Sequence, residues 1–251
     1  MEIRGESKNK ISLFGVPVYK DDREGICECL FTRIKKGENF QIITLNALML
    51  NYAFFNPSFF GVLKKGECVN DSAGVSIAFF LKTGSILERF QGIELFYNAL
   101  CFASAEGFPV FIYGAEESAN RKASENVMKK FPGINICGRL NGYTEGAVEI
   151  IKRASPKILF VALDSPRQEI WINENLSKLR CAAMGIGGTL DVVSGNLARA
   201  PGIFRRIGFE WFGRLIREPR RLHRMANLPV FLARVILGIF GAGKAARSSD
   251  E

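Results

Sequence analysis

The stretch "KILFVALDSPRQEIWINENLSKL", residues 157–179, decides the fold that the sequence predicts. Its first part is an almost unbroken apolar run, which is typical of a strand buried on both faces of a sheet. Its second part predicts a helix, with Ser165 as a candidate N-cap and Pro166 in the first turn. A buried strand that runs through a short loop into a helix is the unit from which parallel α/β sheets are built.

The same alternation of short apolar strands and helices extends from residue 40 to residue 190. The predicted helices include a pair broken near Pro57 and one from about Ile93 to Glu106. The pattern therefore predicts an α/β fold with a parallel sheet and helices on both of its faces. The predicted strands lie in "FQIITLN" (40–46, ending at Thr44), "ECVNDSAG" (67–74), "PVFIYG" (109–114), "INICG" (134–138), "KILFVALD" (157–164) and "CAAMGIGG" (181–188).

Ligands of such sheets bind where the strands end, at their carboxyl edge. Asp71 follows a predicted strand there and suits a general base, a ribose contact or a metal ligand, but also an ordinary loop or helix-capping role. Thr44 and Asn46 flank another strand end, where such residues also form turns. The loops expected at this edge are 44–46, 71–74, 114–116, 164–168 and 185–191.

Two of these loops carry anion-binding features. Arg167, Gln168 and Glu169 open a helix whose free N–H groups favour a sugar or nucleotide phosphate, although Glu169 also suits a helix cap. The glycines of "GIGGTLD" (185–191) allow a ligand to approach the backbone, or simply a tight turn, and "YGAEE" (113–117) is a weaker hint of the same kind. Neither GxGxxG nor GxxxxGK[ST] matches, and the chain has no Asp-x-Asp pair, so the sequence does not indicate a dinucleotide fingerprint, a P-loop or a metal-clamped nucleotide-sugar site.

Composition narrows the class of protein. The 251 residues are 47% apolar, which supports one large α/β domain or a domain with an appendage. The polar N-terminus predicts no secretory signal and the six cysteines form no CxxC pair, so we expect reduced thiols in a cytosolic protein. The single histidine, His223, argues against a Ser-His-Asp triad and a multi-histidine metal site.

Positive charge is concentrated at the C-terminal end. Residues 199–251 hold eleven Lys and Arg against four Asp and Glu, which is seven of the nine net charges. Within "EWFGRLIREPRRLHRM" (210–225), four arginines share a sector of roughly 80° on a helical wheel, and Pro219 marks a joint between two helices. The apolar run that follows, within 228–243, is too short to span a bilayer.

Three interpretations of this segment remain open from the residues alone. It can lie in a membrane interface with its arginines toward anionic headgroups, or form a helix that packs on the body. A nucleic-acid-binding protein is a remote alternative, because no helix-turn-helix, RRM or zinc module is readable and the near-neutral α/β body would have no role.

Taken in order, nine short motifs resemble those of the WecG/TagA/CpsF glycosyltransferase family over about residues 12–236. Each motif alone is unspecific, whereas the ordered set is highly specific. Three residues depart from the family pattern: Ser72 and Asp164 stand where glycine is common, and Asn70 stands where proline is frequent. The motifs are "TLN" (44–46), "NDSAG" (70–74), "ERFQGIEL" (88–95), "YGA" (113–115), "NGY" (141–143), "SPRQEIWI" (165–172), "GIGGTLDVVSG" (185–195), "RAP" (199–201) and "GFEWFGRLIREPRRLHR" (208–224).

The resemblance implies an inverting glycosyltransferase of bacterial cell-surface polysaccharide synthesis, in the cell wall or an exopolysaccharide. It would move N-acetylmannosamine from a UDP-sugar to a polyprenyl-diphosphate-linked acceptor, the alternative being another hexose or a uronic acid donor. The implied fold is a Rossmann-like catalytic domain, residues 1–202, with a basic helical membrane-binding appendage, residues 203–251. We therefore expect a cytoplasmic protein, peripheral on the inner face of the cell membrane, with no metal or other cofactor, no nucleic-acid partner and a possible homo-oligomeric state.

The resemblance also assigns roles to individual residues. Asp71 looks like the base that deprotonates the acceptor hydroxyl, and Thr44 and Asn46 look like polar contacts beside it. Arg89 looks like a cation that faces the donor diphosphate or the acceptor. The expected donor contacts are Gln168, Glu169, Gly114, Gly187, Gly188 and Asp191, and the expected appendage cations on the leaving diphosphate are Arg214, Arg221 and Arg224.

Overall fold

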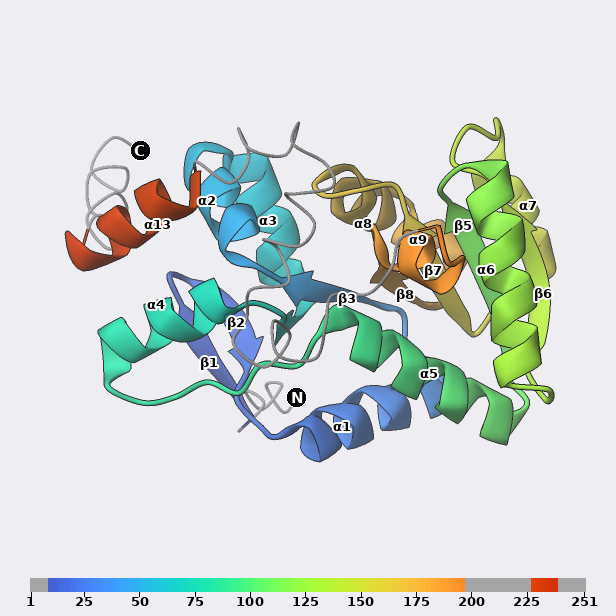
Figure 1. The fold of residues 1–251 in the computed structure, drawn as a ribbon, viewed down its shortest axis with the longest axis horizontal. Coiled ribbons are helices and arrows are strands. Elements are labelled where there is room, and N and C mark those ends of the chain that lie inside the picture. The colour runs from blue at the N-terminus through green and yellow to red at the C-terminus, as the bar shows by residue number, and fades with distance from the viewer. Residues whose placement is uncertain (1–8, 197–226, 239–251) are drawn as a thin grey trace, which may run out of the picture.

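The computed structural model describes residues 9–196 and 227–238, and the first of these ranges forms one eight-stranded sheet (Figure 1). The strand order is β1-β2-β4-β3-β8-β7-β5-β6. The β1–β2 pair is antiparallel and all other pairs are parallel, as the sequence predicts from residue 40 onward. The strands are β1 (Lys10–Leu13), β2 (Val16–Tyr19), β3 (Phe40–Leu45), β4 (Glu67–Asn70), β5 (Pro109–Gly114), β6 (Asn135–Leu140), β7 (Ile158–Ala162) and β8 (Ala182–Gly185).

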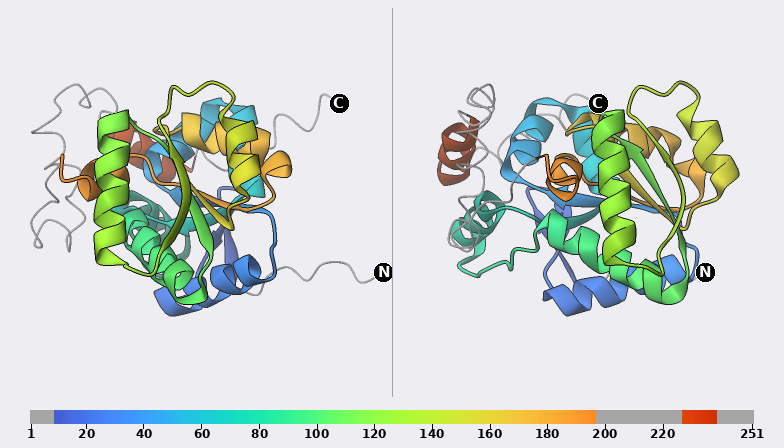
Figure 2. Two further views of the ribbon diagram at one scale, coloured as in Figure 1. Left: turned by 90° about the vertical axis from the view of Figure 1, so that its right-hand side faces the viewer. Right: turned by 45° about the vertical axis from the view of Figure 1, so that its right-hand side comes forward.

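Helices cover both faces of the sheet (Figure 2). Alternate residues of β7 show why: Phe160 points toward α1 and α5, whereas Leu159 and Val161 point toward α7 and α8. The helices packed on the first face are α1 (Arg23–Lys35), α5 (Gly92–Glu106), α6 (Glu117–Lys130) and α9 (Thr189–Val193). Those on the second are α2 (Ala47–Phe55), α3 (Pro57–Lys65), α7 (Ala147–Ala154) and α8 (Arg167–Leu179), and α4 (Ala73–Thr83) and α13 (Asn227–Ile236) lie at the β1–β2 end (Figure 1).

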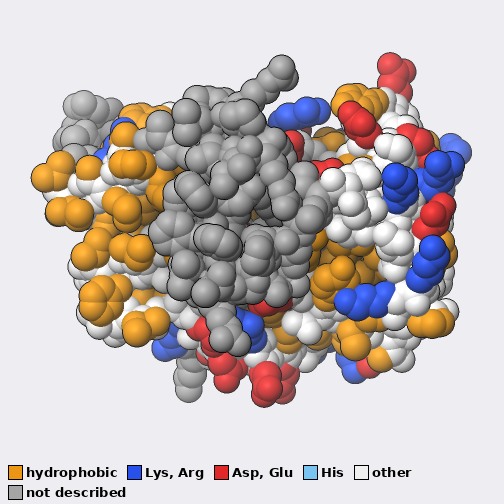
Figure 3. All heavy atoms as spheres, in the orientation of Figure 1, with side chains coloured by type: hydrophobic (Ala, Val, Ile, Leu, Met, Phe, Trp, Pro, Cys, Tyr) orange, Lys and Arg blue, Asp and Glu red, His pale blue; other side chains and the backbone are white. Residues whose placement is uncertain are grey.

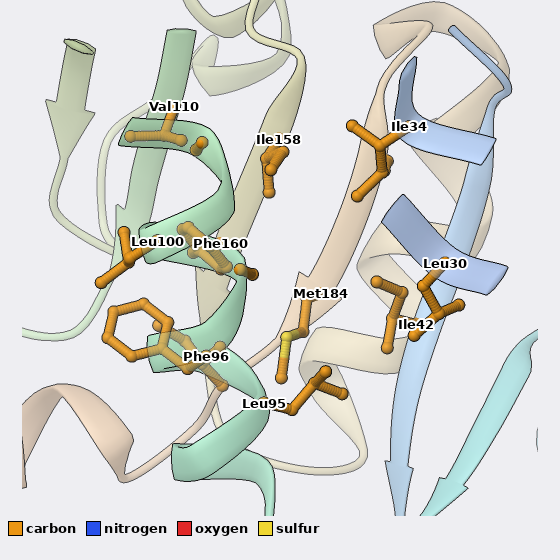
Figure 4. Packing of buried hydrophobic residues seen from close by; sticks show 14 of the residues in the cluster. Leu30, Ile34, Ile42, Leu95, Phe96, Leu100, Val110, Ile158, Phe160 and Met184 are labelled. Atoms are coloured by element: carbon orange, nitrogen blue, oxygen red, sulfur yellow. The ribbon is translucent and has the colours of Figure 1, made fainter. Parts of the chain in front are cut away.

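The larger core lies between α1, α5 and the sheet (Figure 4). Leu95, Phe96 and Leu100 of α5 are spaced to share one helical face, and all three are completely buried. Burying each such side chain contributes about 1.5 to 3 kcal/mol. This packing holds the N-terminus of α5 against the carboxyl end of β3 and β4.

The strand order reverses between β3 and β8. From β3 the chain moves outward to β4, and it returns through β7 to place β8 beside β3. In open α/β sheets the crevice at such a reversal, outside the carboxyl ends of the strands, is where ligands bind. The loops after β3, β4, β7 and β8 therefore surround the expected site.

The β1–β2 hairpin and α1 are not predicted by the sequence patterns, which begin at residue 40. The two hairpin strands have only four residues each, and their turn consists of Phe14 and Gly15 with φ values of 53° and 84°. Such a turn needs positive φ at both positions, and phenylalanine is an unusual residue for it. The common Asn-Gly signal of a hairpin is therefore missing.

Two local predictions are wrong. Ser165 is not the N-cap of α8: Pro166 holds that position, its peptide bond from Ser165 is cis, and no side chain caps the helix. The glycine-rich stretch 185–191 is not wholly a turn, because α9 begins at Thr189 and contains Asp191.

The C-terminal segment is described only in part. Arg214, Arg221 and Arg224 lie outside the described residues, as does the predicted boundary between residues 202 and 203. Helix α13 packs on α2 and α4 through Phe231, which is completely buried. Within residues 9–196 and 227–238, every helix is too short or too polar to cross a bilayer.

Candidate active site

Asp71 lies at the centre of the carboxyl edge, directly after β4. Its backbone N–H donates to the carbonyl of Leu45 at the end of β3, over 3.0 Å. Its Oδ1 accepts a hydrogen bond of 2.6 Å from the backbone N–H of Gly92, the first residue of α5. A helix N-terminus has free N–H groups and a partial positive charge, so it is a suitable anchor for a carboxylate.

Thr44 lies beside the same helix start. A Cβ added to Gly92 would be 3.0 Å from Thr44 Cγ2, so the missing side chain lets β3 and α5 approach closely. The predicted neighbourhood of Thr44 and Asp71 is therefore present in the structure. Asn46 is the N-cap of α2, and its Oδ1 accepts from Met49 N at 3.0 Å.

Ser72 joins the beginnings of two helices. Its Oγ caps α4 by accepting from Val75 N, and it also accepts from Ala47 N, the first residue of α2, both at 3.3 Å. The residue after Asp71 thus fixes α2 and α4 to one point. Nothing in the resemblance predicts this role, because glycine is common at this position.

Asn70 holds the segment that carries Arg89. Its side chain is buried, and its Nδ2 donates to Ser76 Oγ at 2.8 Å and to the carbonyls of Glu88 at 3.0 Å and Leu87 at 3.4 Å. Its backbone carbonyl accepts from Phe90 N at 2.8 Å. The chain on both sides of Arg89 is therefore bound to the residue before Asp71.

Arg23 of α1 holds the same segment from the other side. Its guanidinium lies 2.9 Å from Glu88 Oε1 and 3.0 Å from Glu94 Oε2, and it donates to the backbone carbonyl of Arg89 over 3.0 Å. Asn70 and Arg23 thus hold the backbone of the Arg89 segment next to the residue that precedes Asp71. Sequence reasoning missed the role of both residues, because partners of Asn70 lie up to 18 positions away in the chain and partners of Arg23 up to 71.

Gln168 and Glu169 lie on the other side of β3, at the start of α8. Gln168 Nε2 donates to Glu169 Oε1 over 2.7 Å, and Gln168 Oε1 accepts from Gly187 N over 2.8 Å. Only 3% of Gln168 and 1% of Glu169 is exposed. Both ends of the Gln168 amide are therefore bound inside the protein and fix the turn after β8. A direct contact of either residue with a donor stays a prediction.

The Glu169 carboxyl is isolated from solvent. Burial raises its pKa above the ordinary value of 4.5, and the hydrogen bond from Gln168 opposes this only in part. The backbone carbonyl of Glu169 accepts from Gln41 Nε2 of β3 over 3.0 Å. This bond connects the start of α8 to the strand that carries Thr44.

Gly114 ends β5 in a conformation that only glycine adopts easily. Its φ is 111°, and an added Cβ would lie 2.3 Å from the carbonyl oxygen of Ala162 in β7. Asp164 has a φ of 60°, a value that aspartate tolerates better than most residues. Glycine adopts this φ without strain, which explains why glycine is common at this position in the family. Asp164 lies near Gly187, with its Oδ1 3.9 Å from where a Cβ of Gly187 would be.

The expected residues thus form two groups on either side of the strand reversal. Thr44, Asp71 and the Arg89 segment meet where β3, β4 and α5 join, and Gln168, Gly187 and Asp164 meet where β7, β8 and α8 join. Gly188 and Asp191 lie at the start of α9, next to the second group, and Gly114 lies beyond β7. No cluster of three His, Cys, Asp or Glu residues suited to a metal occurs among residues 9–196 and 227–238. The expectation of a metal-independent enzyme stays a prediction.

Fold and site together define an α/β enzyme with its polar site at the reversal of a parallel sheet. The chain belongs to the glycosyl transferase WecG/TagA/CpsF family, whose family model matches residues 11–244. The resemblance stated from the motifs is therefore confirmed, and the protein is a glycosyltransferase.

Several relatives share one name, N-acetylglucosaminyldiphosphoundecaprenol N-acetyl-beta-D-mannosaminyltransferase. The protein of Bacillus spizizenii strain W23 is 33% identical over 210 residues, which is 82% of each chain. That of Bacillus subtilis strain 168 is 32% identical over 78% of each chain, and that of Staphylococcus aureus strain MW2 is 29% identical over 78% of this chain and 80% of the relative.

Proposed function

We propose that this glycosyltransferase moves N-acetylmannosamine from a UDP-sugar to an N-acetylglucosamine linked to polyprenyl diphosphate, in the synthesis of a cell-surface polysaccharide. The names of the relatives support the transferred sugar and the lipid-linked acceptor. The observation that carries the reaction is the placement of Asp71 at a strand end, with its Oδ1 fixed by Gly92 N–H. The alternative is another hexose or a uronic acid as donor.

In the proposed mechanism Asp71 acts as the general base. The acceptor hydroxyl gives its proton to the Asp71 carboxylate while its oxygen attacks the anomeric carbon. The bond from that carbon to the diphosphate breaks, UDP leaves with the electron pair, and the configuration inverts. The Gly92 N–H keeps the carboxylate in one orientation. Proton transfer is fast when the base and the hydroxyl are already held in the reacting geometry.

Charge on the leaving UDP needs stabilisation. Arg89 is the proposed cation of the catalytic domain, because Asn70 and Arg23 hold its segment beside Asp71. Arg214, Arg221 and Arg224, which lie outside the described residues, are the proposed cations of the appendage. Arginine binds phosphate oxygens in bidentate fashion without a metal, so we propose a metal-independent reaction.

The second group of residues shapes the donor side. Gln168 fixes the backbone of Gly187, and the left-handed φ of 39° at Gly187 leaves a surface without side chain at the edge of β8. A backbone surface of this kind can approach a sugar or phosphate closely. Because the acceptor is a lipid, we further propose that the enzyme acts in the cytoplasm on the inner face of the membrane, with the basic C-terminal segment attracted to anionic lipid.

The test is a screen of UDP-sugars against a short-chain prenyl-diphosphate N-acetylglucosamine, with Asp71→Asn as the first variant. Asparagine keeps an Oδ1 that accepts from Gly92, so the variant should fold while transfer falls by about 10²- to 10⁴-fold. Glu125→Gln, an exposed carboxylate-to-amide change on α6, is the matched control and should keep full activity. Transfer by Asp71→Asn at the wild-type rate would remove Asp71 as the base.

A further inference from the structure

We infer that the end of the molecule formed by α2, α4 and α13 inserts into an anionic lipid bilayer, so that the catalytic body contacts the membrane through α4 as well as through the C-terminal segment. This inference rests on the proposed function and names the surface and the partner by which it is carried out. The sequence predicts membrane contact only for the appendage. The described structure adds helices that lie far from it in the chain.

Exposed hydrophobic residues are concentrated at this end. Of the twelve large hydrophobic residues that are exposed in the described structure, nine lie on these three helices or within three residues of their ends. Single exposed hydrophobic residues are normal on soluble proteins, whereas a contiguous group marks an interaction surface. The nine residues are Tyr52, Phe55, Ile77, Phe80, Leu81, Ile86, Val230, Ile236 and Leu237.

The three helices form one continuous surface. Phe231 of α13 is buried between α2 and α4, and Arg234 of α13 donates to Asn51 of α2. The guanidinium of Arg234 also lies over the Phe55 ring, 4.3 Å from its centroid. Figure 3 shows the result as hydrophobic side chains gathered on the left of the molecule, where α13 and α4 lie.

Helix α4 is apolar on both sides. Val75, Ala78 and Phe79 are buried against the core, so the core already occupies the face that a surface helix normally buries. Ile77, Phe80 and Leu81, spaced three and four residues apart, form a second apolar face that is about half exposed. A soluble helix would have polar residues at these positions, so the second face requires a partner.

The charges around this surface favour a bilayer over a second copy of the chain. Residues 47–65, 73–86 and 227–238 contain Lys64, Lys65, Lys82 and Arg234 but no Asp or Glu. Two copies would bring like charges together, which is unfavourable, whereas anionic headgroups attract them. Long cationic side chains around a hydrophobic face are typical of helices that lie in the membrane interface.

The experiment is flotation of the full chain with phosphatidylglycerol-containing vesicles and with pure phosphatidylcholine vesicles. The test variant is Ile77→Ser/Phe80→Ser/Leu81→Ser on α4, and Val230→Ser/Ile236→Ser/Leu237→Ser on α13 tests the same surface independently. We expect each to raise the lipid concentration for half-binding by at least tenfold. The matched control is Met128→Ser/Ile150→Ser, which removes exposed hydrophobic residues from α6 and α7 and should bind as the wild type does.

Transfer to a water-soluble short-chain acceptor separates this inference from the proposed function. Neither triple variant touches the catalytic residues, so both should keep wild-type transfer in that assay. Unchanged vesicle binding by both variants would overturn the inference even if transfer is observed, and absence of transfer in the wild type would reject the function while leaving the vesicle result valid. Sedimentation that shows a wild-type dimer, dissociated by the same variants with no loss of vesicle binding, would assign the surface to a second copy instead.

Discussion

Replacing Asn70 by alanine should separate the positioning of the active site from the stability of the fold. The change removes the amide that binds Ser76 Oγ and the carbonyls of Leu87 and Glu88, and the Oδ1 that accepts from Ser72 N over 3.2 Å. Leu87 keeps a partner, because Ser76 Oγ also donates to its carbonyl over 2.9 Å. The Glu88 carbonyl and the Ser72 N–H lose their hydrogen bonds to the Asn70 side chain.

The expected magnitude follows from these losses. A polar group left without its partner in a buried site costs about 1 to 3 kcal/mol, and the small cavity adds to this. Because the Glu88 carbonyl belongs to an exposed residue and can bind water, we expect about 2 to 4 kcal/mol in total. The domain should remain folded, since small domains have about 5 to 15 kcal/mol of stability. The Arg89 segment keeps its bonds to Arg23 and to the backbone carbonyl of residue 70, but without the side-chain amide it should shift, and kcat should fall by about 10- to 100-fold because displacements near 1 Å cost that much.

The assay is steady-state transfer beside urea unfolding, with Ile151→Ala as the control. Ile151 is completely buried on α7, far in the sheet order from Asp71, and its truncation should cost about 2 to 5 kcal/mol. We expect similar destabilisation in the two variants but loss of kcat only in Asn70→Ala. The positioning role of Asn70 would be refuted if both variants kept the wild-type kcat, or if both lost kcat to the same extent.

Four further outcomes are expected. Gly185→Ala places a Cβ about 2.7 Å from Gln168 Nε2, so unfolding in urea should show a loss of about 1 to 3 kcal/mol and transfer should fall with it. The raised pKa of Glu169 means that the folded protein binds a proton more tightly than the unfolded chain, a stabilisation that is complete below pH 4.5 and is lost as the pH rises through the folded pKa. The melting temperature of Glu169→Gln should therefore exceed that of the wild type by a margin that grows toward neutral pH. A margin that does not change with pH would contradict this reasoning. Added EDTA should leave transfer within about twofold, whereas complete loss would indicate a catalytic metal. Truncation after residue 202 should leave weak nucleotide binding, measured by calorimetry, and reduce transfer by about 10²-fold or more, and an unimpaired truncated enzyme would exclude a catalytic role for the appendage arginines.

The parallel sheet could be predicted because its strands are short and buried on both sides. The apolar run of β7 and the strand "PVFIYG" of β5 need no tertiary information, and β5 has the predicted bounds. The β1–β2 hairpin could not be predicted, since its edge strands are four residues long and its turn relies on a phenylalanine with positive φ. Ser165 suggested a cap for α8 that the backbone there does not use.

From the sequence, only the site residues at or directly after the ends of strands could be predicted. Asp71 directly follows β4 and Thr44 lies in the last part of the neighbouring strand β3, so their proximity is a consequence of the fold. The parts supplied by contacts between distant segments have no sequence signal: Arg23 reaches a carbonyl 66 positions away, and Asn70 binds a loop beyond α4. Sequence reasoning also missed the internal role of Gln168, whose amide is bound to Glu169 and Gly187, while its contact with a donor stays a prediction.

The hydroxyl of Ser72 accepts hydrogen bonds from the first turns of both α2 and α4. Those two helices extend from the residue next to Asp71 toward the hydrophobic end of the molecule. At about 1.5 Å per residue, the eleven residues of α4 reach on the order of 16 Å. The exposed hydrophobic residues of α4 and the proposed base are therefore joined by one helix and one side-chain oxygen, which together fix their separation.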